Sequence, residues 1–403
     1  MPGKLLIGQA GGATAVINST LAGIVRGARE SGAFEAIWGM RRGAEGSLEG
    51  EFTDLTGIQD ATLDALAATP GAALGSSRHK VTDDEIERLL DIFRRHDIRA
   101  FLYIGGNDSA DTAHRIALRA ADRGFEMAAI AVPKTIDNDL PETDHSPGYG
   151  SIARYVAIAA MDSAKDTESM PTMYPVKVIE VMGRDAGWVA ASAALGKRVP
   201  QDAPHLIYVP ERPLSRDQLL IDVDRVYSRF GRVVAVAAET VRDEHGRPFA
   251  DPGLQSELDQ FGHRLIRGTA DAMCRLIQSE TGLRSRFDKP GSLQRMSMLT
   301  VSSVDLKEAA EVGRAAVRLA ISGVSDRMVT IVRDSDEPYA SHTDSTPLER
   351  VANRQRLLPD DFLRADRSDT TEAFRRYALP LIGPPPLPAY ARLPLEPIRG
   401  AVQ

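Results

Sequence analysis

Short apolar segments rich in β-branched residues alternate with longer segments of helical periodicity along most of the 403 residues. This alternation is typical of βαβ units, in which helices cover a sheet of parallel strands. We therefore predict an α/β fold. The predicted strands are KLLIGQA, EAIWGM, AFLYIGG, MAAIAV, VKVIEVMG, HLIYVPE, VVAVAAE, MSMLTV and MVTIV.

Nine strands in two groups predict two doubly wound, Rossmann-like α/β domains with the active site between them. A cluster of proline and glycines separates a first predicted domain, residues 1–145, from a second, residues 146–291. We expect the chain to return to the first domain near residues 292–322. The pattern then weakens, and residues 335–403 are predicted to form an extension whose proline-rich tail is a surface strap or partner contact.

Composition excludes several classes of protein. The net charge of −7 argues against a general nucleic-acid surface, because binding to a phosphate backbone requires a basic stripe. No stretch approaches the roughly 18 apolar residues of a membrane span, and nothing at the N-terminus resembles a signal peptide, so we expect a cytoplasmic protein. Cys274 is the only cysteine, which excludes a disulfide within the chain and a cysteine metal cluster.

Two predicted strand ends are followed by paired glycines. In open parallel sheets ligands bind beyond the carboxyl ends of the strands, so these turns are candidate sites. Gly12 belongs to the first turn, where backbone amides could approach an anion, although such a pair is as often plain turn chemistry. Asn107 and Asp108 follow the glycines of the second turn, and they could cap a helix or bind magnesium.

A third turn, PKTIDND, follows the apolar strand MAAIAV and contains Lys134, Thr135, Asp137 and Asp139. In an extended segment, Thr135 and the two aspartates would point to the same side. Two such carboxylates repel each other unless a cation or a proton donor joins them, and Lys134 is the nearby cation. For a single aspartate an Asx-turn at the surface is the simpler interpretation, but the whole string favours a site.

Arginines in predicted turns could bind phosphate. Arg78, Arg184, Arg286 and Arg295 all lie in or next to such turns, and Glu239 ends a predicted strand. A guanidinium matches the geometry of phosphate oxygens, so several arginines in an acidic chain fit a substrate with separate phosphate groups.

Taken together, GGND, PKTIDND, VMGR and a late QR resemble the motifs of the 6-phosphofructokinase family. Lys134 and Asp108 resemble the pyrophosphate-dependent branch, and the resemblance runs from about Leu5 to Val332 with the motifs in the same order. It implies reversible, Mg²⁺-dependent transfer of phosphate from diphosphate to the 1-hydroxyl of fructose 6-phosphate. The products would be fructose 1,6-bisphosphate and phosphate, as in glycolysis and gluconeogenesis.

The resemblance also implies residue roles. Asp137 would accept the proton of the sugar hydroxyl, and Asp139 would assist at the metal or orient its neighbour. The residues in contact with fructose 6-phosphate would be Thr135, Asp137, Met182, Gly183, Arg184, Glu239, Arg286, Ser292 and Arg295. Those in contact with the phosphoryl donor would be Gly12, Arg78, Gly105, Gly106, Asp108 and Lys134. The metal ligands would be Asn107 and Asp108. Arg286 would reach the sugar phosphate of a neighbouring subunit, which requires a homo-oligomer, a dimer or a tetramer.

The donor prediction depends on two positions. Relatives that use ATP have glycine where this chain has Asp108 and Lys134. A carboxylate there would repel the nucleotide, while the ammonium could stabilise the phosphate that leaves diphosphate.

Several alternatives stay open at this point. They are ATP as donor, another ketose phosphate such as sedoheptulose 7-phosphate as acceptor, and a non-catalytic sugar-phosphate sensor. A nicotinamide dehydrogenase is less consistent with the first glycine turn, which lacks a third glycine. Two positions depart from the family pattern, which has aspartate at Asn107 and histidine or tyrosine at Ser292.

Overall fold

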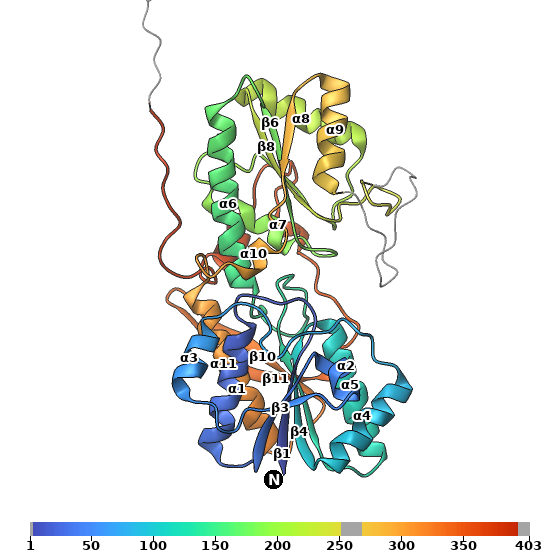
Figure 1. The fold of residues 1–403 in the computed structure, drawn as a ribbon. Coiled ribbons are helices and arrows are strands. Elements are labelled where there is room, and N and C mark those ends of the chain that lie inside the picture. Colours follow the sequence, from blue (N-terminus) through green and yellow to red (C-terminus); the bar gives the residue numbers. More distant parts are fainter. Residues whose placement is uncertain (1–2, 251–267, 394–403) are drawn as a thin grey trace, which may run out of the picture.

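The computed structural model describes residues 3–250 and 268–393. Two α/β units are stacked on each other, each with a central sheet between helices (Figure 1). The first unit contains the N-terminal part of the chain, and the second contains strands β6 to β9. The predicted fold class, two doubly wound domains, is confirmed. No helix in these described ranges is long and apolar enough to cross a membrane.

The first sheet has seven strands in the order β11, β10, β5, β4, β1, β2, β3, and only the pairs β10–β11 and β2–β3 are antiparallel. Their bounds are β1 Lys4–Gln9, β2 Ala36–Met40, β3 Phe52–Asp54, β4 Ile98–Gly105, β5 Ala128–Pro133, β10 Arg327–Asp336 and β11 Tyr339–Pro347. Side chains of β4 alternate between two apolar cores, with Leu102 in one and Phe101 and Tyr103 in the other. Because both faces of the strand are buried, its sequence is a nearly continuous run of apolar residues.

Helices cover both faces of this sheet. One face carries α1 Ile17–Ser31, α3 Asp60–Ala67 and α11 Ser303–Ile321; the other carries α2 Gly43–Leu48, α4 Asp83–Arg95 and α5 Asn107–Asp122. Local chemistry fixes the start of α4, where Thr82 and Glu85 exchange hydrogen bonds in a capping box.

The second sheet has four parallel strands in the order β7, β8, β6, β9. The strands are β6 Val176–Val181, β7 Leu206–Tyr208, β8 Val233–Ala238 and β9 Ser285–Asp288. One face packs against α6 Tyr149–Ser169, α7 Trp188–Ser192 and the 3₁₀ turn Ala193–Gly196, and the other against α8 Arg216–Phe230 and α9 Thr269–Thr281. The periodicity of residues 262–277 predicts one helix; its first residues lie outside the described residues, and residues 269–277 belong to α9.

The chain returns to the first unit through α10 Leu293–Met296 and α11. Helices α1 and α11 pack so closely that a Cβ at Gly23 would lie 2.1 Å from the carbonyl oxygen of Ala310. A Cβ at Gly313 would likewise lie 2.4 Å from the oxygen of Thr20. Glycine therefore permits this backbone contact, which ties the returning chain to the first unit.

One strand prediction is wrong. Residues 296–301, MSMLTV, form the end of α10 and a loop in which the side chain of Leu299 is fully exposed. The fourth strand of the second sheet is β9, which was not predicted because it is short, half of its residues are charged, and it is only partly buried at the sheet edge. Strands β3 and β11 were not predicted either, since both are partly buried edge strands with mostly polar side chains.

The C-terminal extension begins within β10 and includes β11 at the edge of the first sheet. It continues through the 3₁₀ turns Leu348–Arg350 and Asp360–Phe362 and helix α12 Glu372–Ala378 across the junction of the two units (Figure 1). Its last described part runs along α6, where Arg392 pairs with Glu168 and Tyr390 contacts Asp162. We keep the boundaries 1–145 and 146–291 as a proposed domain division.

Candidate active site

A cleft of about 380 Å³ lies between the two units, at the carboxyl ends of strands from both sheets. Turns after β1, β4 and β5 line it on one side, and turns after β6 and β8 line it on the other. The predicted site residues that line it are Gly12, Arg78, Gly106, Asn107, Asp108, Lys134, Thr135, Asp137, Asp139, Met182, Arg184, Glu239 and Arg295. Separate segments of sequence thus converge on one cavity.

Four predicted residues do not line the cleft. Gly105 is buried behind it, where its carbonyl accepts a hydrogen bond from the amide of Lys134 at 3.0 Å. Gly183 lies between two lining residues. Ser292 precedes α10 and is exposed, and Arg286 lies within β9 with its guanidinium 3.8 Å from the centre of the Tyr174 ring. The roles of these four residues remain predictions.

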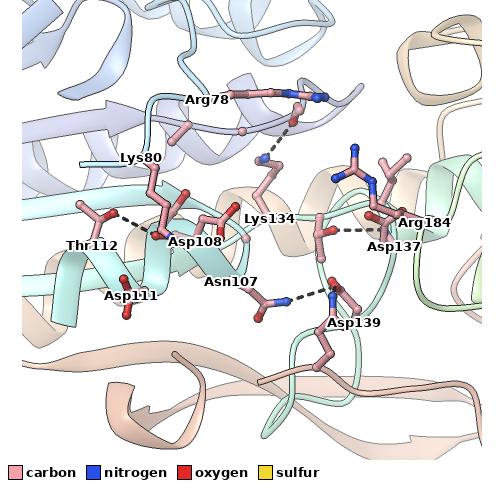
Figure 2. A pocket seen from close by; sticks show the side chains of 18 of the residues that line it. Arg78, Lys80, Asn107, Asp108, Asp111, Thr112, Lys134, Asp137, Asp139 and Arg184 are labelled. Atoms are coloured by element: carbon pink, nitrogen blue, oxygen red, sulfur yellow. Dashed lines mark hydrogen bonds between the residues drawn. The ribbon is translucent and has the colours of Figure 1, made fainter. Parts of the chain in front are cut away.

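Lys134 lies at the end of β5, deep in the cleft (Figure 2). Its Nζ donates a hydrogen bond to the carbonyl oxygen of Gly12 at 2.7 Å, and the residue is only 2% exposed. Burial, together with the positive charges of Arg295 and Arg78, lowers the pKa of Lys134 to about 8, while Asp137 opposes this shift. Two N–H donors remain for a ligand in the cleft.

Asp137 lies three residues further along the same turn, and its amide donates to Oγ1 of Thr135 at 3.1 Å. Burial raises the pKa of the Asp137 carboxyl to about 7, and the negative charges of Asp139 and Glu239 add to this effect. Lys134 and Arg184 act in the opposite direction. A carboxyl that titrates near neutral pH is suited to accept a proton from a hydroxyl group.

Asp139 contacts Asn107, the first residue of α5. Its Oδ2 accepts hydrogen bonds from Nδ2 of Asn107 at 3.1 Å and Nε2 of Gln355 at 3.4 Å (Figure 2). Burial raises the pKa of Asp139. The contact fixes the Asn107 amide with Nδ2 toward Asp139, so Oδ1 points away from that carboxylate. The role predicted for Asp139, to assist at the metal or orient its neighbour, remains a prediction.

The Asn107 Oδ1 atom is buried and has no hydrogen-bond partner. A buried acceptor of this kind normally has a donor, a water or a cation beside it. The carboxylate of Asp108 adjoins it in sequence, and both residues line the cleft. Amide and carboxylate oxygens are ligands that Mg²⁺ accepts, so the donor set fits this ion. The described residues contain no group of three or more His, Cys, Asp or Glu arranged to hold a metal, so phosphate oxygens and water would complete the shell.

Arg295, predicted to bind the sugar phosphate, lies where the two sides of the cleft meet. A Cβ at Gly12 would lie 2.7 Å from its Nη1 atom, so the guanidinium occupies the space that the glycine leaves open. Its Nε is buried without a partner, and burial lowers the pKa of the group. Arg295 can therefore contact ligands on either side of the cleft.

Sequence reasoning missed two cleft residues from the C-terminal extension. Asn353 and Gln355 line the cleft, and Asn353 also donates from Nδ2 to Oδ1 of Asp111 at 2.7 Å. The string NRQR after β11 has no periodicity or motif, so nothing in the sequence places it beside the turn after β5.

Two doubly wound units with a cation-lined cleft at their strand ends have the architecture of an α/β phosphotransferase. The family model described as Phosphofructokinase matches residues 4–320. The chain therefore belongs to the phosphofructokinase family. The predicted family and the predicted enzyme class, a phosphotransferase of the kinase class, are confirmed.

Several relatives are similar over nearly their whole length. The chain is 41% identical to pyrophosphate–fructose 6-phosphate 1-phosphotransferase of Xanthomonas campestris, over 94% of this chain and 91% of that protein. It is 31% identical to a sulfofructose kinase of Alkalicoccus urumqiensis, over 95% and 97%. The solved pyrophosphate-dependent phosphofructokinase of Marinobacter aquaeolei superposes with a TM-score of 0.86 at 34% identity, covering 96% of this chain and 94% of that one. The names of the Xanthomonas and Marinobacter proteins agree with the predicted resemblance to the pyrophosphate-dependent branch.

Proposed function

We propose that this protein transfers a phosphoryl group reversibly from diphosphate to the 1-hydroxyl of fructose 6-phosphate, forming fructose 1,6-bisphosphate and phosphate. The observation that carries the proposal is the position of Lys134, a buried ammonium held by Gly12 inside the cleft. The names of the relatives at about 40% identity support the same donor and acceptor.

In the proposed reaction, the sugar oxygen attacks the terminal phosphorus of diphosphate while the Asp137 carboxylate accepts the hydroxyl proton. The bond from phosphorus to the bridging oxygen breaks, and the electron pair leaves with orthophosphate. Lys134 lies beside the donor turn, where its ammonium would stabilise the charge that develops on the leaving phosphate. Arg184 and Glu239 on the opposite side of the cleft would hold the sugar.

Mg²⁺ would be held by Asn107 Oδ1 and the Asp108 carboxylate together with oxygens of the donor. When bound, the ion would neutralise negative charge on diphosphate. Asp139 supports this arrangement because it holds the amide of Asn107 with Oδ1 free. Asp108 is exposed at the cleft, where its carboxylate would also repel the longer phosphate chain of a nucleotide.

A donor comparison tests the proposal. Purified protein would be given fructose 6-phosphate and Mg²⁺ with either diphosphate or ATP, and fructose 1,6-bisphosphate would be measured. We expect turnover with diphosphate, a reverse reaction from fructose 1,6-bisphosphate and phosphate, and little activity with ATP. Robust turnover with ATP alone would refute the donor assignment, and no turnover with either donor would favour a sugar-phosphate sensor.

The acceptor needs a separate comparison because one relative is named a sulfofructose kinase. With diphosphate as donor, fructose 6-phosphate would be compared with sedoheptulose 7-phosphate and with a 6-sulfonated fructose. All three place an anion at the end of a ketose, which Arg184 and Arg295 could bind. We expect the largest kcat/KM for fructose 6-phosphate; a larger value for another acceptor would replace it in the proposal.

A further inference from the structure

One residue of the C-terminal extension, Arg356, contacts the loop that carries the proposed base. We call residues 134–148 the Asp137 loop. The Arg356 guanidinium donates from Nη2 to the carbonyl oxygen of Asn138 at 2.9 Å. It also donates from Nη1 to the oxygens of Thr143 at 2.8 Å and Asp144 at 2.6 Å. The rigid fork of one arginine thus joins the start of the loop to its far end.

Asn138 stands between the two aspartates of the loop. Its φ of 54° lies in the left-handed region, which asparagine tolerates better than most other residues with a side chain. Nδ2 of Asn138 donates to the hydroxyl of Tyr377 at 2.8 Å, and the amide of Arg356 donates to the carbonyl of Asp139 at 2.7 Å. Residues of the extension therefore hold the Asn138 side chain and the carbonyl groups of Asn138 and Asp139.

Arg356 also contacts the second unit. Its guanidinium lies 4.6 Å from the centre of the Trp188 ring, and its carbonyl accepts a hydrogen bond from Nε1 of Trp188 at 3.2 Å. Trp188 begins α7, directly after the turn that contains Arg184. Arg356 thus contacts both the loop of the proposed base and the first residue of α7, which follows the turn of the proposed sugar contact.

We propose that Arg356 is a positioning residue for phosphoryl transfer, which fixes Asp137 relative to the turn that contains Arg184. Arg356 does not belong to the residues that line the cleft, so it acts through the loop and not on the substrates. This role rests on the proposed function. A displacement of about 1 Å in a reacting group can lower a rate on the order of 100-fold, which sets the expected size of the effect.

Arg212 provides a matched control. Its guanidinium likewise donates to three backbone carbonyls of the extension, those of Asp360 at 2.7 Å, Leu363 at 2.8 Å and Arg364 at 2.6 Å. None of its hydrogen bonds among the described residues reaches the Asp137 loop. A general loss of stability in the extension would therefore affect both arginines, whereas a positioning role belongs to Arg356 alone.

The test compares Arg356→Met with Arg212→Met in the full-length protein. For Arg356→Met we expect kcat to fall on the order of 100-fold, with KM for both substrates changed less than about threefold. Arg212→Met should keep kcat within about twofold. Arg356→Lys keeps the charge but loses the fork, so its kcat should fall about tenfold. In Arg356→Ala, added guanidinium ion should restore part of the lost rate.

Hydrogen exchange gives a readout that does not depend on activity. Amides of residues 138–146 should exchange faster in Arg356→Met than in the wild type. Their exchange rates in Arg212→Met should equal those of the wild type. Unchanged kcat and exchange in Arg356→Met, or equal losses in both variants, would overturn the inference. If Arg356→Met does not fold, kcat and hydrogen exchange of Arg356→Lys test the inference instead. A wild type inactive with diphosphate refutes the proposed function, while the exchange comparison still tests the inference.

Discussion

The two sides of the cleft differ in how many of their predicted residues line it in a single chain. On the proposed donor side, Gly12, Arg78, Gly106, Asp108 and Lys134 line the cavity, and Gly105 does not. On the proposed acceptor side, Arg295 and the turns after β6 and β8 reach it, whereas Gly183, Arg286 and Ser292 do not.

The strand order explains this difference. Strands β5, β4 and β1 are neighbours in the first sheet, so the turns after them meet at one edge. In the second sheet β9 is an edge strand, and Arg286 is part of the strand and not of the turn beyond it. The charged residues of the proposed donor side therefore all line the cleft within one chain. We propose that a second copy of the chain completes the acceptor side.

The largest expected loss of activity follows from replacing Asp137, which belongs to both the proposed donor side and the proposed acceptor side of the cleft. Asp137→Asn keeps the shape but cannot accept a proton, so kcat should fall by about three orders of magnitude in both directions of the reaction. Steady-state rates with each substrate pair would measure it. Asp185→Asn is a suitable control, because Asp185 lines the cleft but pairs with Arg242, and its rate should change only a few-fold. A variant at Asp137 that kept its rate would exclude this residue as the base.

A change confined to the donor side should come next in size. Replacing Lys134 and Asp108 together with glycine removes the buried ammonium and the exposed carboxylate. We expect kcat/KM for diphosphate to fall roughly 100-fold or more, because charge on the leaving phosphate loses its partner. KM for fructose 6-phosphate should change little. Lys134→Met alone separates the ammonium from the carboxylate, and an unchanged rate with diphosphate would contradict the donor assignment.

The turns that line the cleft were predictable from the sequence for a physical reason. Residues in turns after buried strands, such as Asn107 and Lys134, are predictable because the apolar strands are evident in the sequence and their ends converge. The hydrogen bond from Lys134 to Gly12, and the one from Asn107 to Asp139, required coordinates. Both contacts join segments that are far apart in sequence.

The extension was the least predictable part of the chain. Gln355 and Arg356 have no motif, and their partners in the Asp137 loop lie more than 200 residues away. The prediction of a surface strap or partner contact concerned only the proline-rich tail, and no prediction was made that the part near Arg356 contacts the Asp137 loop directly. Edge strands β9 and β11 were missed because an exposed strand need not be apolar.

Arg286 allows the incomplete acceptor side to be tested. Arg286→Met should raise KM for fructose 6-phosphate about tenfold and leave KM for diphosphate nearly unchanged. Co-assembly of Arg286→Met with Asp137→Asn then tests the crossing between subunits. In a mixed oligomer, one site would combine an intact Asp137 with an intact Arg286 from the neighbour, so activity at low sugar phosphate should reappear. No regain of activity would place Arg286 in its own subunit's site or outside any site.

The smallest expected effect is a pH dependence that separates the two sides. Asp137, with a pKa raised to about 7, must lose its proton to act as a base, so kcat/KM should rise as the pH increases through 7. Lys134, with a pKa lowered to about 8, must keep its proton, so kcat/KM should fall as the pH increases through 8. The profile for diphosphate should therefore be a narrow bell with its maximum between these values. Lys134→Arg retains its proton at high pH and should remove only the alkaline limb. If that limb persists in Lys134→Arg, the titrating group is not on the donor side, and the buried ammonium is not what limits the use of diphosphate at high pH.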